Sequence, residues 1–451
     1  MGALGNFTLG ILAAILAILY QSNVHSVLYT GTRLFFGVGH RLEPLGAFPY
    51  KCRRIEDERL QACEDMWLSE ATRQLFLACS EPKGRMQWGP NIAQYNASGR
   101  SLTGHVTVLD IDEPEGAGFT TRVLETPGYP GTHGDGVLNV LGMSGHDDDA
   151  EGGVRLWLID VKPSVDPATG RVLEDQSASG GNQTVEVFRT VGGRKATELE
   201  HLETFSHPLI MTPNRVAAVG DETNAFWVVN DHGHSKNQWG RGSLAFFFSR
   251  GSVAHCTSSD GDSRTRPNCH AAIPSGLAFP NGLVHNHHDG RLYVPSSLLG
   301  TVDIYEPAPN GSLSHVKADT VDVGYSIDNL MVDRDGDVWA PVFPVGKDIG
   351  TVLNDPYGEH GVAGAAMRIR KGKGPDGGWE VEKVLEDGLG EVLPMATSVV
   401  HDAATGRLFF SGEFFSLILH PSPDFTQLLT TGLILLMAGV VSPFIAVCDR
   451  A

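Results

Sequence analysis

The feature that most constrains the fold is a long succession of short, strand-like segments separated by Gly, Asp, Asn and Pro. It begins near residue 52 and continues almost to the C-terminus. Two stretches resemble each other: VRLWLID followed by QTVEVF, and GRLYVPSSLLG followed by TVDIYE. In each, an aromatic strand is followed, after a turn, by a second strand in which polar and apolar residues alternate. We interpret this as a repeated meander blade, with the inner strand first and the next strand after the turn.

Composition supports the same reading, because 54 Gly and 25 Pro residues among 451 favour many turns and short strands. No glycine-rich phosphate loop joins a strand to a helix, which disfavours a nucleotide-binding α/β fold. We therefore predict an all-β fold whose strict period is blurred by insertions at 162–183 and 256–275. The clearest strand candidates are Leu75–Cys79, Val106–Ile111, Val154–Val161, Thr184–Arg189, Ala225–Asn230, Leu292–Val294, Thr301–Tyr305 and Asp337–Val342.

The N-terminus contains an uncharged apolar run from Phe7 to Tyr20. Its fourteen residues suit the hydrophobic core of a signal peptide better than a full membrane span. A basic segment before it and a small-x-small cleavage site after it are both missing. Residues 1–22 are therefore predicted to be a signal peptide or an uncleaved signal anchor, and residues 23–51 a linker or amphipathic segment. We expect a protein of the secretory pathway, extracellular or anchored to a membrane.

Two further features agree with export. Acceptor triplets for N-glycosylation occur at Asn96, Asn182 and Asn310, and a fourth, at Asn6, lies too near the signal to count. The six cysteines form no CxxC or other zinc-like spacing. Their even number is better explained by disulfide bonds.

The formal net charge of −19 argues against nucleic acid or an anionic membrane surface as a partner, because both select for Lys and Arg. Lipid association through the apolar N-terminal segment stays open. The surplus of carboxylates is compatible with hard cations, which bind oxygen ligands, although most carboxylates serve as solvated surface.

The C-terminal region contains a second apolar stretch, residues 428–447, about long enough to span a bilayer. Pro443 and a Thr-Thr-Gly break interrupt it. We favour an insertion at 417–442 within the last blade, since Phe410–Phe415 and Pro443–Cys448 would join as one strand pair. A membrane span and retained intron sequence are the alternatives.

Four polar clusters adjoin strand-like segments. They are Glu64-Asp65, Asn230-Asp231-His232, Asn281 and Asp328-Asn329. Turn chemistry accounts for any one of them alone. Two are harder to explain in this way: VVNDHG places three polar groups directly after an apolar strand, and SIDNLMVD puts a carboxylate inside a buried-looking strand, where it needs an ion or a partner. Strand ends converge around the axis of a propeller, so such oxygens can share an axial calcium ion.

The motifs FWVVNDH, GLAFPNG, TVDIYE, SIDNLMVD and the final AVC are together similar to the paraoxonase family of calcium-dependent esterases and lactonases. The resemblance covers roughly residues 52–416 and the last few residues. It implies a six-bladed β-propeller over 52–451 with two axial calcium ions. The implied ligands of the catalytic calcium are Glu64, Asn230, Asn281, Asp328 and Asn329, and those of a deeper, structural calcium are Asp65, Asp231 and the backbone carbonyl of Met143.

The resemblance also implies a disulfide between Cys52 and Cys448, closing the first and last strands. Cys256 and Cys269 are placed to close a local loop. That leaves Cys63 and Cys79 as thiols or as a third bridge.

In such a site the calcium ion would act as a Lewis acid on an ester or lactone carbonyl, and a general base would deprotonate water. The family's histidine dyad is missing here: Leu141 stands at the first position, and Val161 or Lys162 at the second. The candidate substitutes are His232, which has the best neighbourhood, then His133, His146, and the carboxylates Asp328 and Glu64. His285, His287 and His288 are expected in a solvated turn.

No GxSxG or HExxH motif is present, so the common serine-hydrolase and zinc-protease patterns are excluded. The leading hypothesis is a calcium-dependent hydrolase of aryl esters or lactones acting on a small-molecule substrate. The alternative, motivated by the missing dyad, is a non-catalytic calcium-binding propeller for a hydrophobic ligand or protein. A condensing activity of the strictosidine-synthase type is disfavoured by the intact Asn and Asp series.

Overall fold

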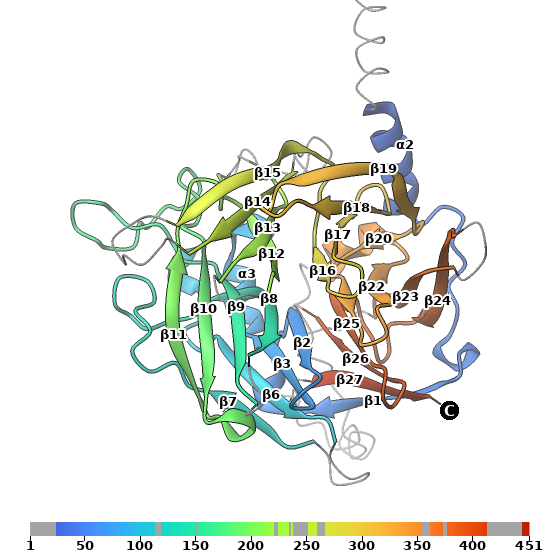
Figure 1. The fold of residues 1–451 in the computed structure, drawn as a ribbon, viewed down its shortest axis with the longest axis horizontal. Helices are drawn as coiled ribbons and strands as arrows, with labels where there is room; N and C mark the ends of the chain where they lie inside the picture. Colours follow the sequence, from blue (N-terminus) through green and yellow to red (C-terminus); the bar gives the residue numbers. More distant parts are fainter. Residues whose placement is uncertain are drawn as a thin grey trace, which may run out of the picture.

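The computed structural model describes residues 24–112, 119–148, 152–220, 224–233, 236–237, 251–258, 267–352, 361–372, 377–412 and 444–450. These residues form six antiparallel blades around a common axis, a six-bladed β-propeller (Figure 1). The inner strands contact one another in order around the whole ring. The predicted all-β propeller is confirmed.

Each blade is named by its strands, from the innermost outward. Blade 1 contains β2 (Asp65–Ser69), β3 (Gln74–Cys79), β6 (His105–Asp110) and β7 (Thr121–Leu124), and blade 2 contains β8 (Val140–Asp147), β9 (Val154–Asp160), β10 (Thr184–Val191) and β11 (Glu198–Phe205). Blade 3 contains β12 (Pro213–Ala218), β13 (Phe226–Asn230), β14 (Gly251–Thr257) and β15 (Asn268–Leu277), and blade 4 contains β16 (Val284–Asn286), β17 (Arg291–Ser296), β18 (Thr301–Pro307) and β19 (Leu313–Asp322). Blade 5 contains β20 (Ser326–Ile327) and β21 (Met331–Val332), which both pair with β22 (Val338–Phe343), then β23 (Gly364–Lys371) and β24 (Trp379–Asp387). Blade 6 contains β25 (Ser398–Asp402), β26 (Arg407–Ser411), β27 (Phe444–Arg450) and β1 (Tyr50–Glu56).

The smaller elements lie between these strands. They are the helices α2 (Val24–Phe35), α3 (Pro82–Gln87) and α5 (Ile349–Val352), the strand pair β4 (Trp88–Gly89) and β5 (Gln94–Tyr95), and the 3-10 turns Leu45–Ala47, Glu58–Leu60, Pro90–Ile92, Ala97–Gly99, Gly193–Lys195 and Gly346–Asp348.

The repeated meander corresponds to β9–β10 in blade 2 and β17–β18 in blade 4, each an antiparallel pair. The prediction that the first strand of each pair is the inner one is wrong, because β8 and β16 lie inside them. The predicted insertion at 256–275 is also wrong at its ends, which belong to β14 and β15. The middle strands have long apolar runs because both of their faces are covered, whereas β16 spans only three residues beside polar groups.

The predicted linker or amphipathic segment contains α2, which buries Leu34 and leaves Leu28 and Tyr29 exposed. The predicted signal or anchor at 1–22 and the predicted insertion at 417–442 lie outside the described residues. Among the helices that are described, none has the length and apolar character needed to cross a bilayer.

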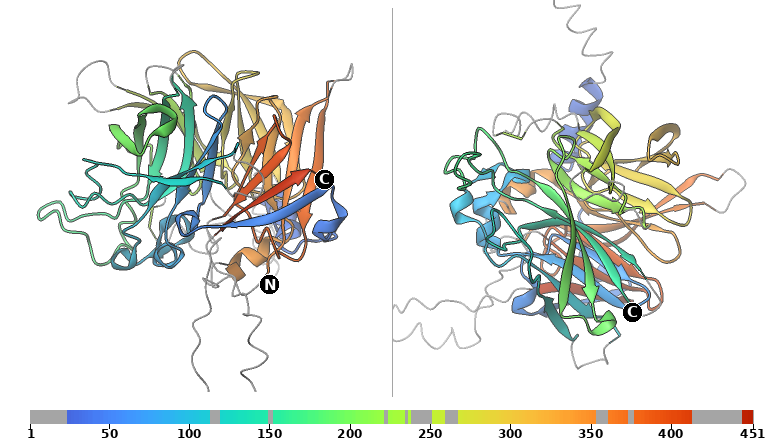
Figure 2. Two further views of the ribbon diagram at one scale, coloured as in Figure 1. Left: turned by 90° about the horizontal axis from the view of Figure 1, so that it is seen from below. Right: turned by 60° about the vertical axis from the view of Figure 1, so that its left-hand side comes forward.

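The ring closes by pairing β1, from the N-terminal side, with β27 at the C-terminus; the two lie side by side in Figure 2. Cys52 faces Cys448 across this pair and forms a disulfide with it, as the resemblance implied. β26 pairs with β27, which confirms the predicted junction across the tail segment. All six cysteines are described, and the other bridges are Cys256–Cys269 and Cys63–Cys79, so the third-bridge alternative holds.

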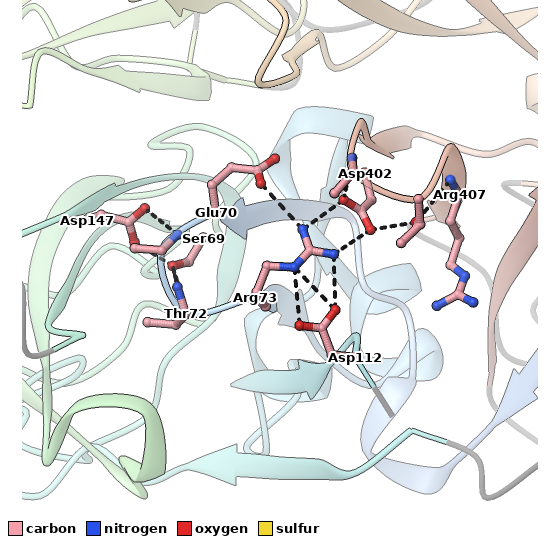
Figure 3. Close-up of polar contacts among 11 residues, drawn as sticks. Ser69, Glu70, Thr72, Arg73, Asp112, Asp147, Asp402 and Arg407 are labelled. Carbon is pink, nitrogen blue, oxygen red and sulfur yellow. Dashed lines mark hydrogen bonds and ion pairs between the residues drawn. The ribbon is translucent and has the colours of Figure 1, made fainter. Parts of the chain in front are cut away.

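Arg73, in the turn between β2 and β3, joins blade 1 to the closing blade (Figure 3). Its guanidinium donates to both carboxylate oxygens of Asp402 at 2.8 and 2.6 Å, and to Asp112. Asp402 is fully buried, whereas Asp112, the other carboxylate that Arg73 contacts, has a side chain that is 44% exposed. Burial alone would raise the pKa of Asp402, but hydrogen bonds from Arg73 and Thr405 outweigh it and lower that pKa.

Because only one of these two carboxylates is buried, we expect Asp402→Asn to lower the free energy of unfolding by about 2–3 kcal/mol. Asp112→Asn removes the same charge from the same arginine and should cost less than about 1 kcal/mol, since exposed pairs contribute little. Urea unfolding of both variants measures the difference. Equal losses would show that Arg73 is not a specific tie between the blades.

Candidate functional site

The two ends of the axial channel carry different residues. Glu64 directly precedes the inner strand β2, Asn281 lies shortly before the inner strand β16, and Asn329 lies in the break between β20 and β21. We call this end, where the inner strands begin, the first mouth. His285 and His401 lie on β16 and β25 at the end where the inner strands finish, which we call the second mouth.

At the first mouth the structure brings Glu64 and Asn329 together, although 265 residues separate them. The Asn329 amide nitrogen donates to Glu64 Oε1 at 2.8 Å. At the start of β25, the Thr397 hydroxyl donates to the Glu64 backbone carbonyl at 2.7 Å, and the Ser398 hydroxyl oxygen lies 3.1 Å from the same carbonyl oxygen. Asp328 is next to Asn329 and also buried. The blade 5 inner strand is thus interrupted at Asp328 and Asn329, and the Asn329 side chain reaches Glu64 from this break.

Gly282, the residue after Asn281, packs closely against Asn329. A side chain at Gly282 would place its Cβ 2.4 Å from the Asn329 Cα atom, so only glycine allows this approach. The amide oxygens of Asn281 and Asn329 are both buried and accept no hydrogen bond. Leaving two buried oxygens unsatisfied is costly, and an oxygen-seeking cation would remove that cost. The first mouth therefore fits a calcium ion through Glu64, Asn281, Asp328 and Asn329.

This donor set combines two carboxylates with two amides. Within the described part of the chain, no group of three or more His, Cys, Asp or Glu residues is arranged around a metal position. Hard oxygen donors of this kind suit calcium better than a transition metal.

The structure gives Asn230 a different role from the predicted one. Its amide oxygen accepts hydrogen bonds from the backbone nitrogens of Met211 and Thr212, both at 2.9 Å. Its amide nitrogen donates to the Leu209 carbonyl and the Ser252 hydroxyl. Both lone pairs of the amide oxygen are thus used to hold the segment before β12. Asn230 also borders a mostly apolar cavity of about 160 Å³.

The three residues predicted to hold a deeper calcium do not fit one. Asp65 is ion-paired with Arg215 at 2.8 Å. Met143 presents its N–H to Asp65, also at 2.8 Å, and a donor N–H repels a cation. Asp231 Oδ1 accepts the backbone N–H of His232 at 2.7 Å.

Of the three candidate base histidines, His232 lies at the first mouth, directly after β13. Its side chain is buried, its Nδ1 lies 2.9 Å from Asp231 Oδ1, and its ring meets Phe279 edge-on. His133 is exposed on the loop before β8 and packs on Gly170. His146 lies at the second mouth, with its ring 6.4 Å from that of His287. His146 is thus at the wrong end of the channel to act with Glu64.

The side chains at the positions predicted for the family's histidine dyad are apolar or ion-paired. Leu141 and Val161 belong to one buried hydrophobic cluster. The Lys162 ammonium donates to buried Glu186 at 2.6 Å. Burial alone would raise the pKa of Glu186, but hydrogen bonds from His201 and Lys162 lower it to about 2. None of these side chains offers a base.

At the second mouth, a cavity of about 220 Å³ is lined by His285, His287, His288, His401 and Asp333. The prediction of a solvated turn is confirmed for His287 and His288, which are exposed in the turn after β16, and is wrong for His285, which lies on β16 and is only partly exposed. Burial lowers the pKa of His285. Burial would raise the pKa of Asp333, but hydrogen bonds from His401 and Trp339 lower it. The sequence signal for this cluster is the run His-Asn-His-His at 285–288. That run does not show that its first two residues end the short strand β16.

Comparison with known proteins gives three results. Residues 176–371 match the arylesterase family. Serum paraoxonase/arylesterase 1 of Rattus norvegicus is 27% identical over 169 residues, and the Mus musculus protein gives the same figures. The match covers 37% of this chain and 43% of each relative, so less than half the length of these relatives is matched.

Solved structures with a similar overall course include two gluconolactonases. The periplasmic enzyme of Pseudomonas aeruginosa has a TM-score of 0.43 and 12% identity, covering 86% of this chain and 85% of that one. The enzyme from Xanthomonas campestris has a TM-score of 0.43 and 15% identity, with coverage of 91% and 94%.

Proposed function

Since this chain is a distant, paraoxonase-like member of the arylesterase family, we propose that it is a calcium-dependent hydrolase of aryl esters or lactones. The observation that carries the proposal is the pair of buried amide oxygens, on Asn281 and Asn329, that accept no hydrogen bond. They lie beside Glu64 and Asp328 at one mouth of the propeller. This combination of oxygen donors is what calcium requires.

The ligands would be Glu64, Asn281, Asp328 and Asn329, and a bound calcium ion would polarise the substrate carbonyl and stabilise the oxyanion that develops on it. The surrounding residues position these ligands before any substrate arrives. Thr397 and Ser398 fix the Glu64 backbone, and the Asn329 amide nitrogen fixes the Glu64 carboxylate. Pre-positioned ligands avoid a reorganisation cost during the reaction.

We assign the general base to His232. Its ring is buried, and Nδ1 lies 2.9 Å from Asp231 Oδ1, although the two atoms do not have hydrogen-bond geometry. In this role a ring nitrogen would accept the proton of the attacking water. Asp328 and Glu64 are the alternative acceptors, each at the first mouth.

The competing function is a non-catalytic calcium-binding propeller for a hydrophobic ligand or protein. It is favoured by the apolar side chains of Leu141 and Val161, which fill the dyad positions. Hydrolysis separates the two functions, since both depend on the same ion.

The test is a panel of phenyl esters and of five- and six-membered lactones, assayed with purified protein at saturating calcium. We expect turnover of at least one class, lost in His232→Ala and Asn281→Ala. Asn310→Ala changes an exposed asparagine in the turn between the outer strands β18 and β19, so this variant should retain wild-type turnover. Calcium binding with no turnover on the whole panel would leave the non-catalytic function in place.

Three disulfides are typical of proteins that fold in the secretory pathway. The acceptors Asn96, Asn182 and Asn310 are all exposed, as glycosylation requires. We propose that the protein is exported and glycosylated, and that its N-terminal region associates with lipid. The exposed apolar residues of α2 support the last part of the proposal.

A further inference from the structure

We propose that Arg215 is a built-in cation that takes the place of a second ion on the propeller axis, so that this chain binds one calcium ion and not two. The inference rests on the proposed function for the one ion at the first mouth. It concerns the buried carboxylate of Asp65, which has no exposed surface.

The Asp65 carboxylate is fully satisfied by the protein. Oδ1 accepts from the Met66 backbone nitrogen at 2.9 Å and from the Ser398 hydroxyl at 3.0 Å. Oδ2 accepts from the Met143 backbone nitrogen and from Arg215 Nε, both at 2.8 Å. An ionised carboxylate has about four acceptor positions, and all of them are used here. A metal ion would have to displace at least one of these donors.

Arg215 also supplies the charge that a second ion would supply. Its side chain is 3% exposed and belongs to β12 in blade 3, whereas Asp65 begins β2 in blade 1. A second guanidinium nitrogen donates to the Leu330 carbonyl in blade 5. The guanidinium is permanently charged, so Asp65 is neutralised at any calcium concentration. One side chain thus links three blades across the axis.

The pair also bears on the first mouth. The Ser398 hydroxyl that donates to Asp65 lies 3.1 Å from the Glu64 carbonyl oxygen and 3.3 Å from the Asn329 amide nitrogen. Holding Asp65 therefore holds the residue that contacts two proposed calcium ligands. We infer that Arg215 is a positioning residue, which keeps the first mouth assembled when calcium is absent.

Calorimetric titration of the calcium-depleted protein with CaCl₂ tests the stoichiometry. We expect one ion per chain, lost in Asn281→Ala and retained in Asp65→Asn. Two ions per chain, with one lost in Asp65→Asn, would overturn the Arg215 inference and leave the proposed function standing. No ion at all would instead refute the calcium part of the proposed function.

A gain-of-site variant tests the role of Arg215 itself. Arg215→Ser leaves Asp65 buried without its cation, so its melting temperature in chelator should fall by many degrees. Added calcium should raise it more than it raises the wild-type value, with a second ion bound. The double variant Arg215→Met, Asp65→Asn carries no buried charge, so it should fold and bind one ion even if Arg215→Ser does not fold. If the double variant bound two ions, the inference would be wrong.

Discussion

Asp328→Asn is expected to lower kcat/KM for phenyl acetate or a simple lactone by about 10²–10³-fold while the propeller stays folded. The change keeps the shape of the side chain but removes one of two carboxylates that we assign to the calcium ion. Weaker binding of the ion and a weaker field on the carbonyl act in the same direction. Steady-state kinetics at several calcium concentrations separate them, because excess calcium corrects only the first.

The matched control is Asp333→Asn. Asp333 is buried to a similar extent and lies just beyond β21 in the same blade, but it faces His401 at the second mouth. Removing this charge should change stability and leave kcat/KM within about threefold of the wild-type value, since it does not touch the proposed ligands. If both variants lost activity equally, the first mouth would not be the site of hydrolysis.

Removing the closing disulfide with Cys52→Ser and Cys448→Ser is expected, from chain entropy, to lower the free energy of unfolding by about 6 kcal/mol. The bridge joins residues 396 positions apart, so it restricts almost the whole unfolded chain. It also fastens β1 to β27, the pair that closes the ring. Urea unfolding under non-reducing conditions measures the change.

Cys256→Ser with Cys269→Ser provides the comparison, because that bridge spans 13 positions. The chain-entropy argument gives about 3 kcal/mol for such a short loop. The closing bridge should therefore cost more to remove than the local one. The reverse order would mean that ring closure is held by β-pairing and packing, with the disulfide contributing little.

The strand pattern was readable from the sequence wherever both faces of a strand are covered. β9, β10, β17 and β18 are continuous or alternating apolar runs, and their repetition predicted a meander blade. The inner strands were less visible. β16 has three residues, and the inner strand of blade 5 is broken by Asp328 and Asn329, so polar site residues replace the apolar signal there.

Part of the site could be predicted because polar residues stand out inside a buried, apolar strand. A carboxylate and an amide inside a buried-looking strand predicted a special role for Asp328 and Asn329, and the structure places Asn329 against Glu64. The commitment of Asn230 to two backbone N–H groups was not readable, because it depends on the path of the segment before β12. The Arg215–Asp65 pair spans 150 residues and leaves no local pattern.

The most direct test of the account is hydrolysis by calcium-depleted protein, followed by titration with CaCl₂. Turnover should disappear on chelation and return along a saturation curve that coincides with the binding of one calcium ion per chain. Mg²⁺ should restore little, because it requires a smaller, near-octahedral set of ligands. Full activity after complete removal of calcium would contradict the account.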